Sequence, residues 1–198
     1  MKNVKTIFSV IVVATIMTLA TFTGCKSQQQ TTSSGGRNPF GGGTYEAPCA
    51  VYDDDKNFAA TGIASGPSTQ MGSIQRVALG NAQDMIRAKM EHAYEGFIDN
   101  YMESIGANRG TDIETETRGV GRQTILQIVG NASHSCLKFS DVDNKGNVNC
   151  YIAVTIPKER IAQAVADNLS KSQKAEIRNR AADARKEMNE YFKNLKNE

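Results

Sequence analysis

Residues 133–157, SHSCLKFSDVDNKGNVNCYIAVTIP, decide the fold. The run Asp-Asn-Lys-Gly at 143–146 separates two apolar stretches and is a strong hairpin turn signal. Centring the turn on residues 144–145 sets Phe139 opposite Cys150 and Leu137 opposite Ile152, so the apolar faces of the two strands agree. The second strand alternates strictly, which predicts one buried face made of Val148, Cys150, Ile152, Val154 and Ile156.

A strand and a long helix are expected before this hairpin. Residues 58–65 (FAATGIAS) are typical of a strand, with glycine and small residues where a helix would pack closely. From about Ser73 to Ile105 apolar residues recur at spacings of three and four, which predicts a helix with Ser73 as its N-cap. The polar stretch Gly106–Arg118 is predicted to be a loop, and Gly121–Val129 a short helix.

Two further helical patterns follow the hairpin. Pro157 suits the start of a helix whose apolar stripe is Ile161, Val165 and Leu169. A second stripe has the heptad-like spacings 4, 3, 4, 3, 4: Ile177, Ala181, Ala184, Met188, Tyr191 and Leu195. This stripe fits a helix folded back on its own domain or one that meets another helix, and its two alanines favour the first. The predicted class is α+β: a long helix on a small antiparallel sheet, in the order β-α-β-β-α, with a C-terminal helical extension.

The beginning of the chain has the layout of a secretory signal peptide. Lys2 and Lys5 precede the uncharged apolar run 7–20 (IFSVIVVATIMTLA). Phe-Thr-Gly-Cys at 22–25 resembles a lipobox, which predicts cleavage between Gly24 and Cys25 and acylation of Cys25. An uncleaved membrane anchor is the alternative, but the run is short for a span of about 20 residues. Two or three acyl chains would hold the protein firmly in a membrane.

The sequence divides into four parts on this interpretation: a signal peptide (1–24), a flexible tether (25–48), an α+β domain (49–169) and a C-terminal amphipathic helix (170–198). The tether is rich in Gln, Thr, Ser and Gly and has almost nothing to bury. Its root-mean-square reach is roughly 25–29 Å. In lipoproteins of this type an aspartate after the acylated cysteine favours inner-membrane retention. Lys26 therefore indicates the outer membrane, and a periplasm-facing position is expected.

The motifs Thr-Gly-Ile-Ala-Ser-Gly (61–66) and Tyr-Ile-Ala-Val-Thr-Ile (151–156), together with the pattern Ala78, Ala82, Arg87 and Ala88, resemble the LPP-type family of small bacterial outer-membrane lipoproteins of about twenty kilodaltons. The resemblance covers roughly residues 58–169. It implies a dodecin-like domain, with a helix packed on an antiparallel sheet, and a lipoprotein with no known catalytic site. Family members have been linked to envelope and surface-appendage assembly.

Three cysteines remain once Cys25 is assigned to lipid, in a compartment expected to be oxidising. The hairpin register points Cys150 inward and Cys136 outward, so a bond between these two is disfavoured. Cys49 is left as a candidate partner of either Cys136 or Cys150. One thiol must then stay free or bond between molecules.

Few residues of this sequence are candidates for catalysis or for metal binding. His134 and Cys136 alternate on one strand and would share a face, which raises the idea of a thiol nucleophile or a metal ligand. A zinc site, however, needs four ligands and typically shows paired spacings that are absent here. The run 141–152 starts like a calcium loop, but Lys145 and Ile152 occupy ligand positions five and twelve. The acidic run 53–55 is read as solvated. No catalytic, metal or cofactor site is predicted.

The charge balance excludes a nucleic-acid-binding protein, because removal of residues 1–24 leaves 21 basic against 21 acidic residues. We expect a non-enzymatic structural or interaction module of the cell envelope that binds envelope proteins or itself, with no small-molecule substrate evident. A periplasmic regulator of a cell-wall-synthesis enzyme is the alternative, and a thiol-dependent enzyme is less favoured. The predicted contact surface is aromatic: Tyr94, Phe97, Tyr101, Tyr191 and Phe192.

Overall fold

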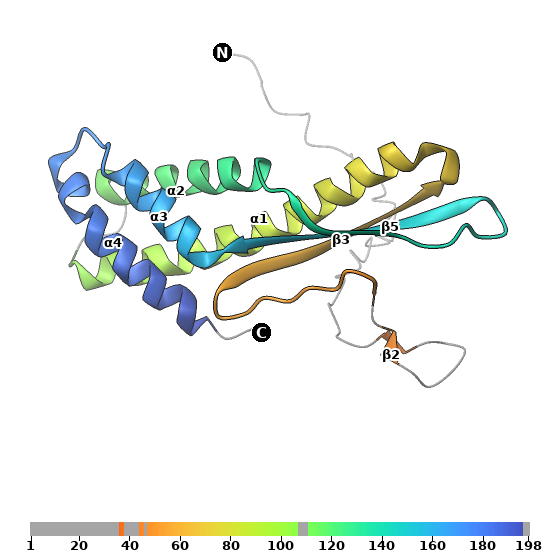
Figure 1. Ribbon diagram of the computed structural model, residues 1–198. Helices are drawn as coiled ribbons and strands as arrows, with labels where there is room; N and C mark the ends of the chain where they lie inside the picture. The colour runs from red at the N-terminus through yellow and green to blue at the C-terminus, as the bar shows by residue number, and fades with distance from the viewer. Residues whose placement is uncertain (1–35, 38–43, 46, 107–110, 196–198) are drawn as a thin grey trace, which may run out of the picture.

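The computed structural model describes residues 36–37, 44–45, 47–106 and 111–195, and it has an α+β fold (Figure 1). A three-stranded antiparallel sheet has the order β3-β5-β4, and two very short strands, β1 and β2, pair separately. The strands are β1 (Gly36–Arg37), β2 (Thr44–Tyr45), β3 (Asn57–Pro67), β4 (His134–Phe139) and β5 (Asn147–Pro157). The helices are α1 (Met71–Ser104), α2 (Asp112–Gly130), α3 (Lys158–Leu169) and α4 (Ala175–Asn194). Within the described residues no helix is long and apolar enough to cross a membrane.

The hairpin β4–β5 has the register predicted from the sequence. Phe139 lies opposite Cys150 and Leu137 opposite Ile152. The even-numbered residues 148–156 of β5 are all buried, as the alternation predicted. In the turn, the Asp143 carboxylate accepts the backbone N–H groups of Lys145 and Asn147, both at 2.8 Å. These bonds, led by that from Asn147, hold the pKa of Asp143 below its usual range.

Helix α1 packs against β3 so closely that little space is left between the two backbones. A Cβ atom placed on Gly62 would lie 2.1 Å from the carbonyl oxygen of Ala78 and 2.4 Å from the amide nitrogen of Ala82. Both alanines have no exposed surface. The predicted close packing of a helix on small residues of this strand is therefore confirmed, and glycine is required at position 62 because any side chain would collide with helix backbone.

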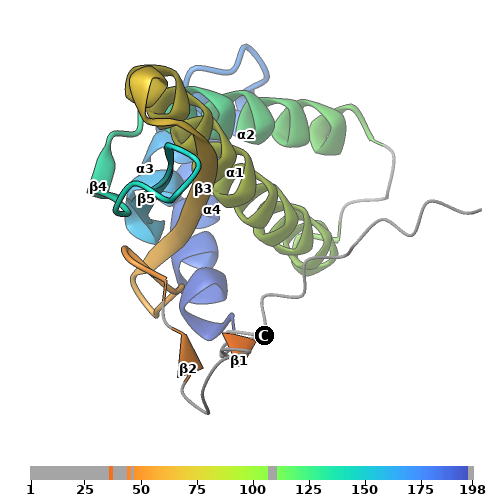
Figure 2. The ribbon, with the colours of Figure 1, turned by 90° about the vertical axis from the view of Figure 1, so that its right-hand side faces the viewer.

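The second half of α1 extends beyond the sheet and forms a helical layer with the other helices. At 1.5 Å per residue α1 is roughly 50 Å long, and Figures 1 and 2 show α2 beside its second half. Helix α4 turns back against α3 and α1, and its inward residues join the same core cluster as the sheet. The second apolar stripe thus packs within its own domain, as its alanines favoured. The inward residues of α4 are Ile177, Ala181, Ala184, Met188 and Phe192.

Lys158 fastens the end of α4 to the start of α3. Its side chain is buried, its Nζ donates to the carbonyl oxygen of Phe192 at 2.9 Å, and it lies 5.2 Å from the centre of the Phe58 ring. The carbonyl belongs to the last turn of α4, where backbone acceptors lack helical partners and attract a cation. The buried ammonium group therefore makes both a hydrogen bond and a cation–π contact with the Phe58 ring.

The predicted loop at residues 106–118 is wrong from residue 112 onward, because α2 begins there rather than at Gly121. The Thr111 side chain caps the helix by accepting the N–H of Glu114 at 3.3 Å. The inward residues of its first turns are Glu114, Thr117 and Gly121. None of them is a large apolar residue, so this segment shows no apolar residues at helical spacing that would predict a helix. The predicted N-cap at Ser73 is also wrong, since α1 already begins at Met71 and has no side-chain cap.

Substitution of Gly62 by alanine tests the contact between α1 and β3. We expect Gly62→Ala to lower the free energy of unfolding by roughly 1–3 kcal/mol or more, because backbone atoms of α1 must move to admit the methyl group. Gly80→Ala is the matched control, since nothing lies within 4 Å of the added atom. It should stabilise the helix by about 0.5–1 kcal/mol. Urea denaturation followed by circular dichroism measures both. Equal stability of the two variants would contradict the close contact.

Candidate functional site

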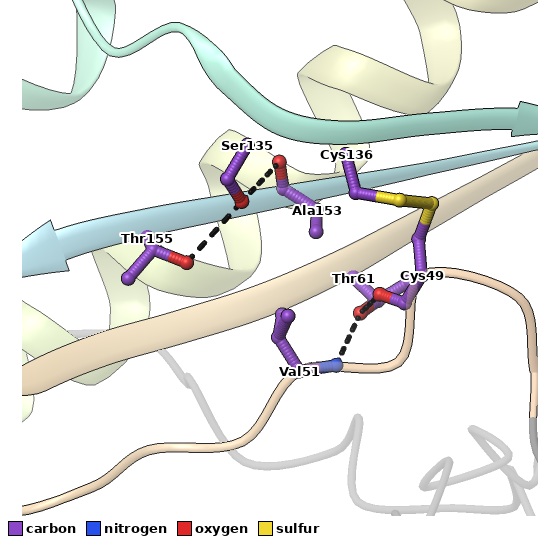
Figure 3. The surroundings of a disulfide bond; sticks show 7 residues. All are labelled: Cys49, Val51, Thr61, Ser135, Cys136, Ala153 and Thr155. Atoms are coloured by element: carbon purple, nitrogen blue, oxygen red, sulfur yellow. Dashed lines mark hydrogen bonds between the residues drawn. A yellow bond between two sulfur atoms is a disulfide. The ribbon is translucent and has the colours of Figure 1, made fainter.

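A disulfide bond ties the segment before β3 to the edge strand β4. Cys49 and Cys136 are joined with a Cα–Cα distance of 5.7 Å, across a sequence separation of 87 (Figure 3). This is one of the two pairings that the sequence left open. Cys150 is free and buried, and burial raises the pKa of its thiol. Gly24 and Cys25, the predicted cleavage and lipidation site, lie outside the described residues.

Residues 47–56, here called the strap, run along β3 below the sheet. The Thr61 hydroxyl donates to the carbonyl oxygen of Cys49 at 2.8 Å and accepts the N–H of Val51 at 3.2 Å (Figure 3). The Asp53 carboxylate accepts the N–H of Ala59 at 2.7 Å and pairs with the Lys89 ammonium at 3.1 Å. The strap therefore occupies the backbone N–H of Ala59 and the side chain of Thr61 on an edge strand, which limits pairing with another chain there.

The acidic run 53–55 has two structural roles. Asp53 pairs with Lys89 of α1, and Asp54 accepts the backbone N–H groups of Lys56 and Asn57 at 2.7 and 2.6 Å. The side-chain amide of Asn57 leads the contacts that hold the pKa of Asp54 below its usual range. Asp54 and Asp55 are exposed, as predicted, whereas Asp53 is half-buried. Across the described residues, no group of three or more His, Cys, Asp and Glu side chains is placed to hold a metal ion.

His134 and Cys136 do not share a face of the sheet, so that prediction is wrong. A bulge in β4 pairs His134 with Val154 and Cys136 with Ala153, and neighbouring residues of β5 point to opposite faces. The extra residue, Ser135, directs its hydroxyl to the carbonyl oxygen of Ala153 at 3.3 Å (Figure 3). The Cys136 sulfur is also bonded to Cys49, so this arrangement offers no thiol nucleophile next to the histidine.

The five aromatic residues predicted as a contact surface form a ladder inside the domain. Successive ring centres lie 5.3–6.2 Å apart along Tyr94, Phe97 and Tyr101 on α1, and from Phe97 through Tyr191 to Phe192 on α4. All are buried except Tyr191, which is half-buried. The prediction of an exposed aromatic surface is therefore wrong, because Tyr94 faces α2 and the other four side chains lie in the core or between α1 and α4.

Helices α1 and α2 are joined by one buried hydrogen bond and a group of ion pairs. The Tyr94 hydroxyl donates to the carbonyl oxygen of Thr117 at 2.7 Å, beside Gly121, where a Cβ atom would lie 2.0 Å from the ring. Burial raises the pKa of Tyr94. Next to it the Arg118 guanidinium contacts three carboxylates, those of Glu95, Asp99 and Glu114.

The Tyr101 hydroxyl differs from that of Tyr94, because it is buried and makes no hydrogen bond within the described part of the chain. Burial raises the pKa of Tyr101 too. The residue lines a cleft of about 780 Å³ between the last turns of α1 and the outer face of α4. Five charged side chains line the α4 side of this cleft: Arg180, Asp183, Lys186, Glu187 and Glu190. The aromatic pattern had placed Tyr101 and Tyr191 at one site, but it gave no indication of a cleft.

Comparison with protein-family models, with curated proteins and with solved structures finds no match to this chain.

A pair of tyrosine substitutions tests the assignment of the two buried hydroxyls. Tyr94→Phe removes a buried hydrogen bond and should lower the free energy of unfolding by about 1–2 kcal/mol. Tyr101→Phe removes a hydroxyl without a partner, so stability should stay within about 0.5 kcal/mol of wild type or rise slightly. Thermal and urea unfolding of both variants measures this. A large loss in Tyr101→Phe would mean that its hydroxyl has a partner.

Removal of the disulfide tests its contribution to stability. The double variant Cys49→Ala/Cys136→Ala should lose about 2–4 kcal/mol of unfolding free energy, because a long closed loop no longer restricts the unfolded chain. A reducing agent should destabilise the wild type by a similar amount and leave the double variant unchanged. Fast alkylation of both cysteines in the native, unreduced protein would contradict the bond.

Proposed function

We propose that this protein is an exported bacterial lipoprotein, held in the outer membrane by acyl chains on Cys25 and facing the periplasm. Its folded part acts as a non-enzymatic structural or interaction module of the cell envelope. The observation that carries the proposal is the disulfide between Cys49 and Cys136. Such bonds persist in oxidising compartments and are rare in the cytosol, so this bond supports export and the signal-peptide interpretation of residues 1–24.

The use of the four cysteines supports lipidation of Cys25. Two are joined to each other, and Cys150 lies in the core with no exposed surface. Cys25 is then the one cysteine without a place in the described fold, and it directly follows a small glycine, which lies four residues after the end of the apolar run 7–20. Acylation would block this thiol in an oxidising compartment, where an exposed free cysteine would react with other thiols.

The position of the disulfide suits a domain held by its N-terminal end. The tether, residues 25–48, leads directly into Cys49, and the bond continues from there into β4, which pairs with the central strand β5. A pull on the tether would therefore reach the sheet through a covalent link. Residues 50–56 of the strap and β3, which follow Cys49 in sequence, would carry less of this force. This arrangement supports a structural role close to the membrane surface.

Membership of the LPP-type family, with its dodecin-like arrangement, belongs to the same proposal and is supported by the motifs at 61–66 and 151–156. Two other functions are less well supported. A regulator that reaches through the cell wall needs a longer tether than one of roughly 25–29 Å. A thiol-dependent enzyme would need a free thiol at Cys136, which the disulfide and the bulge beside His134 argue against.

Substitution of Cys25 tests the proposal. Wild-type protein should fractionate with the outer membrane and incorporate radiolabelled palmitate, whereas Cys25→Ala should be unlabelled and lose its membrane association. Cys150→Ala is the matched control, since it removes a buried cysteine and should leave labelling and fractionation unchanged. Labelled, membrane-bound Cys25→Ala protein would refute lipidation at this residue.

A further inference from the structure

The cleft between α1 and α4 has the features of a binding site for a small ligand. Its volume of about 780 Å³ falls within the range of about 300–1,000 Å³ that is usual for small-molecule pockets. Two contacts bridge the helices along it. The rings of Phe97 and Tyr191 lie 6.2 Å apart, and the Ser104 hydroxyl donates to the Glu187 carboxylate at 3.3 Å. The cleft therefore has fixed walls made by rigid elements.

The buried hydroxyl of Tyr101 is the second observation that points to a ligand. Tyr101 is 4% exposed, and its hydroxyl has no partner among the described residues. Buried polar groups are nearly always hydrogen-bonded, and leaving one unpaired costs about 1–3 kcal/mol. Tyr101 and Arg180 both line the cleft and also a small void of about 10 Å³ beneath it. The void holds at most one water-sized group, so a larger acceptor meets the Tyr101 hydroxyl and the Arg180 guanidinium only where a shift of Arg180 opens the void to the cleft.

The charges of the cleft match a ligand that carries both signs. Arg180 and Lys186 supply two cations, and Asp183, Glu187 and Glu190 supply three carboxylates. Within the described part of the chain Asp183, Lys186 and Glu190 make no ion pair, and the bridge from Arg180 to Glu176 is long at 3.8 Å. A simple anion would be repelled by the three carboxylates and a simple cation by the two basic groups. A zwitterion has one group that the basic residues attract and another that the acidic residues attract.

We propose that this cleft binds a small zwitterionic ligand with the chemistry of an amino acid or a short peptide with free ends. Its carboxylate lies against Tyr101 and Arg180, and its amine lies among the acidic residues of α4. Arg180 borders both the cleft and the small void, and its side chain is 40% exposed, so a change of its rotamer would connect the two spaces. Half-buried Tyr191 offers a ring for an apolar side chain of the ligand.

This proposal is independent of lipidation, because it uses only residues of α1 and α4. Titration calorimetry of the full chain in detergent, with its disulfide intact, tests it with four probes: alanine, trialanine, N-acetyl-trialanine and trialanine amide. Trialanine should bind saturably, and blocking either end should weaken binding about tenfold or more, since each end loses a charged contact. Saturable binding of alanine would show that a free amino acid is a sufficient ligand. Binding of trialanine but not of alanine would show that the site requires a peptide.

Three variants distinguish this site from non-specific binding. Tyr101→Phe and Arg180→Gln should each weaken trialanine about tenfold, while Tyr101→Phe keeps or raises thermal stability. Arg185→Gln is the matched control, because Arg185 lines a different pocket, beside Glu159 of α3, and should leave binding unchanged. Absence of saturable binding by both alanine and trialanine would overturn the proposal. So would binding that is insensitive to the block of either end of the peptide, or to both substitutions at the cleft.

Discussion

The contact between the backbone of α1 and Gly62 of β3 is the constraint on which the other packing depends. With Ala78 and Ala82 held against the strand, the axis of a 34-residue helix is fixed. Its second half then projects beyond the sheet as a frame for α2 and α4. Hydrophobic burial supplies most of the stabilisation, but the absence of a side chain at one strand position sets the geometry. The aromatic ladder and the cleft of α1 and α4 both lie on the part of α1 that this contact directs.

The two faces of the sheet are covered by different kinds of interaction. The helical face is packed with apolar residues of β5 and α1 at full burial. On the other side the strap is held by a covalent bond and by polar contacts to Thr61, Ala59 and Lys89. A disulfide and side-chain hydrogen bonds can hold a short segment that has little apolar surface to bury. In the proposed lipoprotein this segment is also where the tether meets the folded domain, so the covalent bond lies at the junction.

Local patterns predicted the parts of the fold that depend on local periodicity. The alternation of residues 148–156 fixed the hairpin register, and the three-and-four spacing predicted α1 over nearly its whole length. The second half of α2 was predicted as the short helix Gly121–Val129, but its first half was missed because the inward positions there are Glu114, Thr117 and Gly121, although Thr111-x-x-Glu114 is a capping signal that marks its start. The bulge at Ser135 was not predicted, because the alternation of residue types along β4 shows no sign of it. The aromatic residues were placed on the surface because no local pattern shows that α1 and α4 face each other, and the same absence of long-range information left the partner of Cys49 open.

The proposal that acylated Cys25 anchors a disulfide-bonded domain is tested most directly by mass spectrometry of the mature protein extracted from membranes without reduction. The account predicts an N-terminus at Cys25 whose mass includes a diacylglyceryl group, a linked peptide pair containing Cys49 and Cys136, and Cys150 as a free thiol. A chain that retains residues 1–24, or that begins at an unmodified Cys25, would contradict it.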